Sequence, residues 1–228
     1  MLKNMQKEIR TQAYVLRRTN YGEADRILNI ITPGGKISAI AKGARKEKSK
    51  LAGGIEMFSL IEITVHHNKS DFGIVTSAKM LKYYDKILMT YEKMELATML
   101  LKEINKVAEN SDSAEYFKLI DQGLDSINNG INTALVESWF LLNLMKAQGE
   151  DMNLYRDVNG NKLMEESRYD WDALEKAFVV RDKGEFGARE IKTLRLMTKL
   201  DIATVGKIKN IDEMLMRILR LMRVTSGH

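Results

Sequence analysis

Six cationic side chains lie close together early in the sequence, in a stretch of fifteen residues that holds a single acid, Glu47. They are Lys36, Lys42, Arg45, Lys46, Lys48 and Lys50. The formal net charge of the chain is +5, and this stretch alone accounts for that excess. Such a block can neutralise phosphates and release their counterions, so its chemistry is the binding of a polyanion. A solvated loop without a partner is the alternative that composition leaves open.

Other chemistry has few residues to carry it. The chain has no cysteine, which excludes disulfides, thiolate metal sites and cysteine nucleophiles. Its three histidines are His66, His67 and His228, and the first two face opposite sides of a predicted strand. No phosphate-loop, nucleophile-elbow or zinc-protease motif occurs. We therefore expect a protein that is not an enzyme and that holds no metal or cofactor.

A second group of cations lies near the end of the chain. Arg189, Lys192, Arg195 and Lys199 recur every three or four residues, which places them on one face of a helix. A similar set follows at Arg217, Arg220 and Arg223. Either set could receive more nucleic acid or an acidic peptide, and an ordinary solvated helix face is the alternative.

The elements that must position the first basic block are short strands. Apolar residues alternate with polar ones, with turn residues between the runs. The predicted strands are 11–18, 26–32, 36–42, 55–66 and 72–78, with a turn at 68–71 between the last two. Without helices between them they cannot form a parallel sheet, so we predict a five-stranded antiparallel barrel of the OB type. The glycine-punctuated segment 43–54 follows the third strand as a basic loop.

In OB barrels the face of strands 2 and 3, with the loops beside it, binds nucleic acid. We expect the six cations there, with Arg17 and Arg18 as outer contributors. The aromatic residues available to stack on bases are Tyr14, Tyr21, Phe58 and Phe72, and Tyr21 is the candidate. Because at least half of these should be core residues, phosphate contacts should dominate and little sequence specificity is expected.

After residue 80 the apolar period changes from two to nearly four, which predicts helices. One spans 94–108, and Asp112 or Ser113 can cap the next. Asn132 can cap a central helix that is apolar almost all round and ends before Gly149. Two amphipathic helices, 188–200 and 211–224, close the chain. Residues 149–187 are predicted to be irregular, with a short helix capped by Asp170.

The predicted fold is therefore α+β: an OB-type domain over residues 1–80 and a helical bundle over residues 81–228. The first residues are charged and lack the apolar stretch of a signal peptide. No window approaches the roughly 20 apolar residues of a membrane span. We expect no membrane association and a cytoplasmic protein, associated with the nucleoid if its polyanion is chromosomal DNA.

With these residues in view, the chain resembles the RecO family of bacterial recombination mediators. The resemblance rests on motifs in a fixed order and covers nearly the whole chain. They are Thr11-x-Ala13-x-Val15-Leu16, Tyr21-Gly22-Glu23-x-Asp25-Arg26-Ile27, Thr32-Pro33-x-Gly35-Lys36-Ile37, Ala41-Lys42-Gly43-Ala44-Arg45 and, more weakly, Trp139-Phe140-Leu141-Leu142 before Gly149. Many members carry a four-cysteine zinc motif after the central helix, where this chain reads Tyr155-Arg156-Asp157-Val158-Asn159-Gly160. This chain therefore resembles a form of the family without the zinc ligands.

The resemblance implies a protein without enzymatic activity. The family binds single- and double-stranded DNA and anneals complementary strands, including strands coated by single-strand binding protein. With RecR it helps to load the RecA recombinase during gap repair. The acidic tail of single-strand binding protein would then be the expected peptide for the C-terminal cations. An RNA-binding OB protein of translation or RNA metabolism is the alternative, and a small enzyme with an unseen site is a further one.

Overall fold

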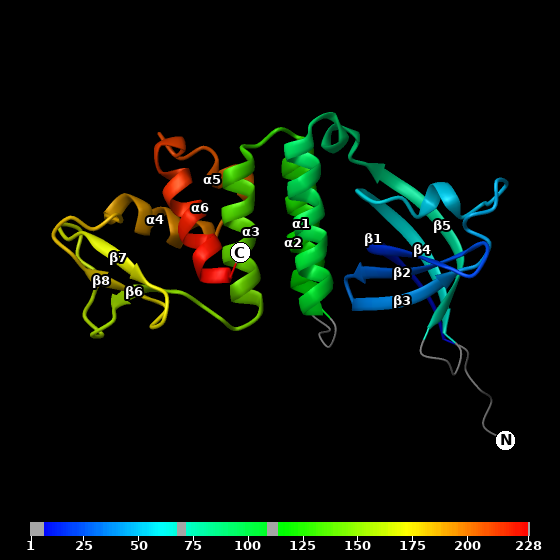
Figure 1. Ribbon diagram of the computed structural model, residues 1–228, viewed down its shortest axis with the longest axis horizontal. Coiled ribbons are helices and arrows are strands. Elements are labelled where there is room, and N and C mark those ends of the chain that lie inside the picture. Colours follow the sequence, from blue (N-terminus) through cyan, green and yellow to red (C-terminus); the bar gives the residue numbers. More distant parts are fainter. Residues whose placement is uncertain (1–6, 68–71, 109–113, 228) are drawn as a thin grey trace, which may run out of the picture. The chain divides into compact units, whose positions relative to one another are not determined.

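A computed structural model describes residues 7–67, 72–108 and 114–227. The chain forms two compact units, residues 1–128 and 129–228. Within the described residues the first unit holds a closed barrel and two α-helices, and the second holds four α-helices and a small sheet (Figure 1). The first compact unit thus continues beyond the barrel to Asn128, whereas the sequence suggested a boundary at residue 80.

The barrel has five strands in the order β1-β2-β3-β5-β4, and β4 closes it by pairing with β1. Every pairing is antiparallel except the short one between β3 and β5. This is the strand order of an OB fold, and the prediction is confirmed. The strands are β1 (Lys7–Tyr21), β2 (Asp25–Thr32), β3 (Gly35–Ala41), β4 (Ser59–His67) and β5 (Gly73–Tyr83).

Alternating side chains fill the barrel. Along β4, Ile61, Ile63 and Val65 are fully buried, whereas the intervening Glu62 and Thr64 are only half-buried. Two residues outside the strands, Ala44 and Ile55, belong to the same core. The segment after β3 is therefore anchored in the barrel at two points.

Three strand predictions need correction, and one of them is the fifth strand, since β5 continues to Tyr83 rather than ending at residue 78. β1 is longer at both ends than residues 11–18, because it continues to pair with β4 at one end and with β2 at the other. Ile55 does not begin a strand: it follows the short 3-10 helix η1 (Ala52–Gly54), and Phe58 adopts a φ of 56° before β4 starts at Ser59. The predicted turn at 68–71 lies outside the described residues.

Helices α1 (Tyr91–Val107) and α2 (Ala114–Asn128) pack on β1, β2 and β3 (Figure 1). The 3-10 helix η2 (Asp85–Met89) leads from β5 into α1, whose N-cap Thr90 accepts a 3.3 Å hydrogen bond from the Lys93 amide. The apolar spacing predicted both helices. The proposed caps of α2, Asp112 and Ser113, lie outside the described residues.

The second unit is built around α3 (Thr133–Ala147), with α4 (Ala188–Met197), α5 (Ile202–Val205) and α6 (Asp212–Ser226) against it. As predicted, Asn132 caps α3 by accepting a 3.0 Å hydrogen bond from the Ala134 amide, and Gly149 ends it with a φ of 79°. No helix in the described ranges is long and apolar enough to cross a membrane.

Residues 149–187 are more regular than the sequence suggested. They contain a small sheet in the order β6-β8-β7, made by β6 (Asn153–Asp157), β7 (Tyr169–Asp172) and β8 (Ala177–Val180). Asp170 caps no helix: it lies in β7, and its Oδ1 accepts a 2.9 Å hydrogen bond from the Glu185 amide. Aromatic rings packed edge to face hold the sheet, namely Tyr169, Trp171, Phe178 and Phe186.

Candidate nucleic-acid interface

The basic loop, residues 42–50, is a chain of tight turns. The Lys46 amide donates a 3.1 Å hydrogen bond to the Gly43 carbonyl, and the Ser49 amide donates a 3.0 Å bond to the Lys46 carbonyl. Gly43 has a φ of 64°, which a residue without a Cβ adopts at little cost. The turns give each successive side chain a defined direction.

Both ends of the segment after β3 are fixed to the barrel. Ala44 is 2% exposed and packs in the barrel core. At the far end, Gly54 lies so close to β5 that a Cβ there would stand 2.2 Å from the carbonyl oxygen of Ala78. Ala44 and Gly54 therefore fix this segment to the barrel, and the charged residues between them are exposed.

The loop is also tied to the turn between β1 and β2. The Gly43 amide donates a 2.7 Å hydrogen bond to Oδ1 of Asp25. The Arg45 amide donates a 2.8 Å bond to the Ala24 carbonyl, and its guanidinium donates a 3.2 Å bond to the Gly22 carbonyl. The β1–β2 turn and the basic loop thus form one continuous surface at this end of the barrel.

The basic loop carries five cations. In the described part of the chain none of them forms an ion pair with an acid, and all five are exposed: Lys42, Arg45, Lys46, Lys48 and Lys50. Glu47, the acid among them, is also exposed. The loop therefore offers a net charge of +4 to a polyanion.

Lys36 is placed differently from the other five. Its ammonium donates a 2.7 Å hydrogen bond to the Asn105 carbonyl near the end of α1, and the side chain is half-buried. Beside it, Asn29 of β2 donates a 3.3 Å bond to the side chain of Asn105. Helix α1 thus covers this part of the face of strands 2 and 3, which the sequence suggested was open to nucleic acid.

The two arginines of β1 do not act as a pair. Arg18 is half-buried, lies opposite the core residue Leu28 and forms a 2.8 Å ion pair with Glu56. Arg17 is exposed and lies opposite Asn29, on the face that carries α1. Among the described residues, no hydrogen bond or ion pair joins either side chain to the basic loop.

Of the four aromatic residues considered for stacking, two are core residues. Tyr14 is 1% and Phe58 8% exposed, whereas Tyr21 is 54% and Phe72 38% exposed. Tyr21 ends β1 at the turn that contacts Arg45. Among the four, it is therefore the exposed ring that lies next in sequence to a residue in contact with the basic loop.

Most of the C-terminal cations already have partners. On α4, Arg189 pairs with Glu213 at 3.3 Å, Lys192 pairs with Glu165 at 2.6 Å, and Arg195 donates a 2.9 Å bond to the Leu154 carbonyl. Lys199 is exposed. On α6 each arginine pairs with an acid: Arg217 with Glu190, Arg220 with Glu185 and Arg223 with Glu137. Acidic side chains of the second unit therefore neutralise most of the positive charge on these helix faces.

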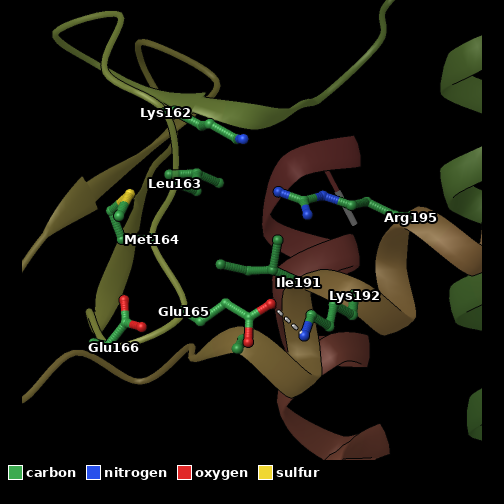
Figure 2. A pocket seen from close by; sticks show the side chains of 9 residues that line it. Lys162, Leu163, Met164, Glu165, Glu166, Ile191, Lys192 and Arg195 are labelled. Atoms are coloured by element: carbon green, nitrogen blue, oxygen red, sulfur yellow. Dashed lines mark ion pairs between the residues drawn. The ribbon is translucent and has the colours of Figure 1, made fainter.

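Lys192 and Arg195 line a pocket of about 310 Å³ between α4 and the segment after β6. Figure 2 shows Lys162 pointing toward the pocket from the side of Arg195, while the ion pair of Lys192 with Glu165 closes the opposite side. Leu163 and Ile191 form its apolar wall. An acidic ligand here would have to compete with Glu165 for Lys192.

The residues after α3 do not fit the zinc site that the family resemblance led us to consider. Without cysteine, Asp157 is the donor at the matching stretch, and its carboxylate is already occupied. It accepts hydrogen bonds from the amides of Asn159 at 2.9 Å and Asn161 at 2.8 Å. These bonds close the turn that a metal would otherwise organise, so no role for zinc is derived.

Comparison with known proteins agrees with this geometry. Residues 5–84 match the family model described as "Recombination protein O N terminal", and residues 89–224 match "Recombination protein O C terminal". The boundary between these two matches lies near the end of the barrel.

Curated proteins of the same kind are similar to the chain. It is 31% identical over 149 residues to "DNA repair protein RecO" of Roseiflexus sp. (strain RS-1), covering 64% of this chain and 52% of that protein. It is 28% identical over 165 residues to the protein of the same name from Dehalococcoides mccartyi (strain ATCC BAA-2266 / KCTC 15142 / 195), covering 71% and 65%. The match therefore spans between half and two thirds of these relatives. With both family models matched in order over most of its length, the chain belongs to the recombination protein O family, RecO.

Proposed function

We propose that this protein binds DNA in recombinational repair, gripping the sugar–phosphate backbone of single and double strands through the basic loop. The observation that carries the proposal is the set of five exposed cations on a loop whose turns are fixed by hydrogen bonds. Cations presented in this way bind phosphates without reading bases. The name shared by the relatives, "DNA repair protein RecO", supports the same role.

Annealing follows from the same chemistry. Two complementary strands repel each other through their phosphates, and a protein that neutralises both can hold them while base pairs form. No covalent bond is made or broken in this process. We accordingly propose a binding protein rather than an enzyme, with no step that depends on a metal or cofactor.

The partners we propose are those that the family implies. They are RecR, the acidic tail of single-strand binding protein, and the RecA pathway into which the protein would deliver its strands. An acidic tail on α4 would have to displace Glu165 or Glu213 from their ion pairs. Titration with a labelled tail peptide tests this point, and the absence of binding at micromolar peptide would remove the tail from the proposal.

The central experiment is a titration of a labelled single-stranded oligonucleotide, followed by fluorescence anisotropy at several salt concentrations. About five phosphate contacts give a log–log salt slope of about −3.5 on single strands. Reversal of three charges, Arg45→Glu, Lys46→Glu and Lys48→Glu together, should abolish binding without unfolding, because none of these side chains is buried. Affinity that hardly changes between low and moderate salt would contradict the proposal.

A matched control separates the loop from net charge. Arg181→Glu, Lys183→Glu and Lys209→Glu together remove the same charge from exposed positions of the second unit. This variant should keep most of its affinity, with a salt slope close to that of the unmodified protein. Equal losses in both triple variants would mean that overall charge, rather than the loop, binds the DNA.

Two further measurements define the activity. Mixing complementary labelled strands, bare and coated with single-strand binding protein, measures annealing directly. Competition between DNA and RNA oligonucleotides of the same sequence tests the alternative of an RNA-binding protein. Preference for RNA would favour that alternative, since the phosphate contacts by themselves do not distinguish the two.

A further inference from the structure

Asp25 is an acid within a surface that we propose binds an anion. It begins β2, and its Oδ1 accepts the 2.7 Å hydrogen bond from the Gly43 amide, eighteen residues further along the chain. Its charge opposes DNA binding, since a carboxylate beside bound phosphates repels them. If net charge alone set the affinity, this position would favour a neutral residue.

The hydrogen bond has a role that a neutral apolar residue cannot fill. Gly43 starts the first turn of the basic loop, with a φ of 64° and a carbonyl that accepts the Lys46 amide. Its own amide points back to Asp25, and the next tie, from the Arg45 amide to the Ala24 carbonyl, follows two residues later. Carboxylate and carbonyl together fix the backbone from which Lys42, Arg45 and Lys46 project.

We propose that Asp25 is a positioning residue for DNA binding, which orients the basic loop through the Gly43 amide although its charge opposes the ligand. The inference rests on the proposed function. The charge of Asp25 lowers the affinity for DNA, whereas its hydrogen bond to the loop raises that affinity, and the second effect is the larger. Asp25 touches the loop backbone and not the DNA.

Because the charge and the hydrogen bond of Asp25 should affect DNA binding in opposite directions, two substitutions of this residue can distinguish them. Asp25→Ala removes both the charge and the acceptor, so we expect about tenfold weaker binding of a single-stranded oligonucleotide at 0.1 M salt. The salt slope should fall from about −3.5 to about −2, as two of five contacts are lost. Asp25→Asn removes the charge but keeps an oxygen acceptor, so it should bind at least as tightly as the unmodified protein.

Glu47→Ala is the matched control. Glu47 carries the same charge, lies in the loop and makes no hydrogen bond or ion pair with other described residues. Its loss should tighten binding about twofold to threefold, because only the electrostatic cost disappears. If Asp25→Ala also tightens binding, or if Asp25→Asn loses as much affinity as Asp25→Ala, the proposal is overturned.

A second pair of variants covers the case in which Asp25→Ala does not fold. Gly43→Ala strains the same turn at the residue that donates the hydrogen bond, since an alanine at a φ of 64° is unfavourable. Asparagine tolerates this conformation. Gly43→Ala should weaken binding several-fold and Gly43→Asn should largely restore it. Unaltered affinity in folded Gly43→Ala would also overturn the proposal.

Hydrogen exchange separates this inference from the proposed function. In the protein without DNA, the amides of residues 42–50 should exchange faster in Asp25→Ala than in Asp25→Asn, by about tenfold at Gly43. Equal exchange would overturn the positioning role even if DNA binds. Faster exchange in a protein that binds no DNA would instead support the loop geometry and contradict the function.

Discussion

The hydroxyl of Tyr14 donates a 2.6 Å hydrogen bond to Oδ1 of Asp121 and so joins the first strand of the barrel to helix α2. The Tyr84 hydroxyl lies 2.9 Å from that of Tyr14. Because the single proton of Tyr14 is given to Asp121, Tyr84 donates to Tyr14. Burial, together with the hydrogen bond to Asp121, raises the pKa of Tyr14 well above its ordinary value, so this hydroxyl is protonated at neutral pH and can donate.

Tyr14→Phe should therefore destabilise the first unit. The substitution leaves a carboxylate oxygen of Asp121 without its donor, at a cost of about 2 kcal/mol in the free energy of unfolding. Urea unfolding followed by circular dichroism measures the difference. Tyr21→Phe is the control, since that ring is 54% exposed, and it should unfold like the unmodified protein. Equal stability of Tyr14→Phe would show that the hydroxyl chain contributes nothing.

Substitutions of Lys36 and Lys48 should have different effects, the first on the free energy of unfolding and the second on DNA binding. Lys36→Ala removes the 2.7 Å hydrogen bond to the Asn105 carbonyl and should lower the unfolding free energy by about 1 kcal/mol, with the DNA salt slope unchanged. Lys48→Ala removes one phosphate contact, so the slope should become less steep by about 0.7 while stability stays the same. The reverse pattern would return Lys36 to the binding surface and remove Lys48 from it.

Glu190 should make the second unit sensitive to acid. Burial raises the pKa of its carboxyl, but hydrogen bonds from its own amide, the Gly187 amide and Arg217 outweigh this, and the net pKa lies below its usual value of 4.5. Its stabilising effect is thus complete above pH 4.5 and is lost as the pH falls through the native pKa.

The comparison of Glu190→Gln with the unmodified protein tests this pH dependence. The variant should be about 2 kcal/mol less stable at pH 7, because a charged hydrogen bond to Arg217 becomes a neutral one. Below pH 4 the difference should shrink, since the native carboxyl is then increasingly protonated. A constant difference from pH 7 to pH 3 would assign the effect to packing instead.

The small sheet should be independent of metal. Dialysis against a chelator is expected to leave the melting temperature unchanged, because hydrogen bonds to Asp157 and the packed aromatic rings close this segment. Asp157→Ala should lower the stability of the second unit by about 2 kcal/mol, as two amides lose their acceptor. A melting temperature that drops after chelation would reveal a metal site that the donor chemistry does not suggest.

The barrel could be predicted from the sequence because its information is local. In β4, the alternation of Ile61, Ile63 and Val65 with polar residues is sufficient to assign a half-buried strand. The cap at Asn132 and the stop at Gly149 are equally local signals. Where strands begin and end was less predictable, since β1 extends only as far as its neighbours β2 and β4 pair with it.

The site was predictable in charge but not in detail. The charge pattern identified the basic loop. The sequence gives no sign that Lys36 differs from the other cations, because the carbonyl that it binds belongs to Asn105, 69 residues away. The ion pairs of the C-terminal arginines are likewise long-range, as for Arg223 with Glu137, 86 residues apart. The short strands after α3 were not predicted because aromatic rings from residues 169–186, rather than an alternating pattern, stabilise β7 and β8, and β6 is held by pairing with β8.

The backbone of the basic loop is held mainly by residues other than its exposed cations, although the Arg45 guanidinium also contributes through its hydrogen bond to the Gly22 carbonyl. Ala44, Gly54 and Asp25 fix the chain, while lysines and an arginine reach outward from it. Substitutions of the exposed lysines should therefore change the affinity that we propose for DNA without lowering the free energy of unfolding. Homologous proteins could thus differ in the salt concentration at which they bind a polyanion through substitutions at these exposed positions alone.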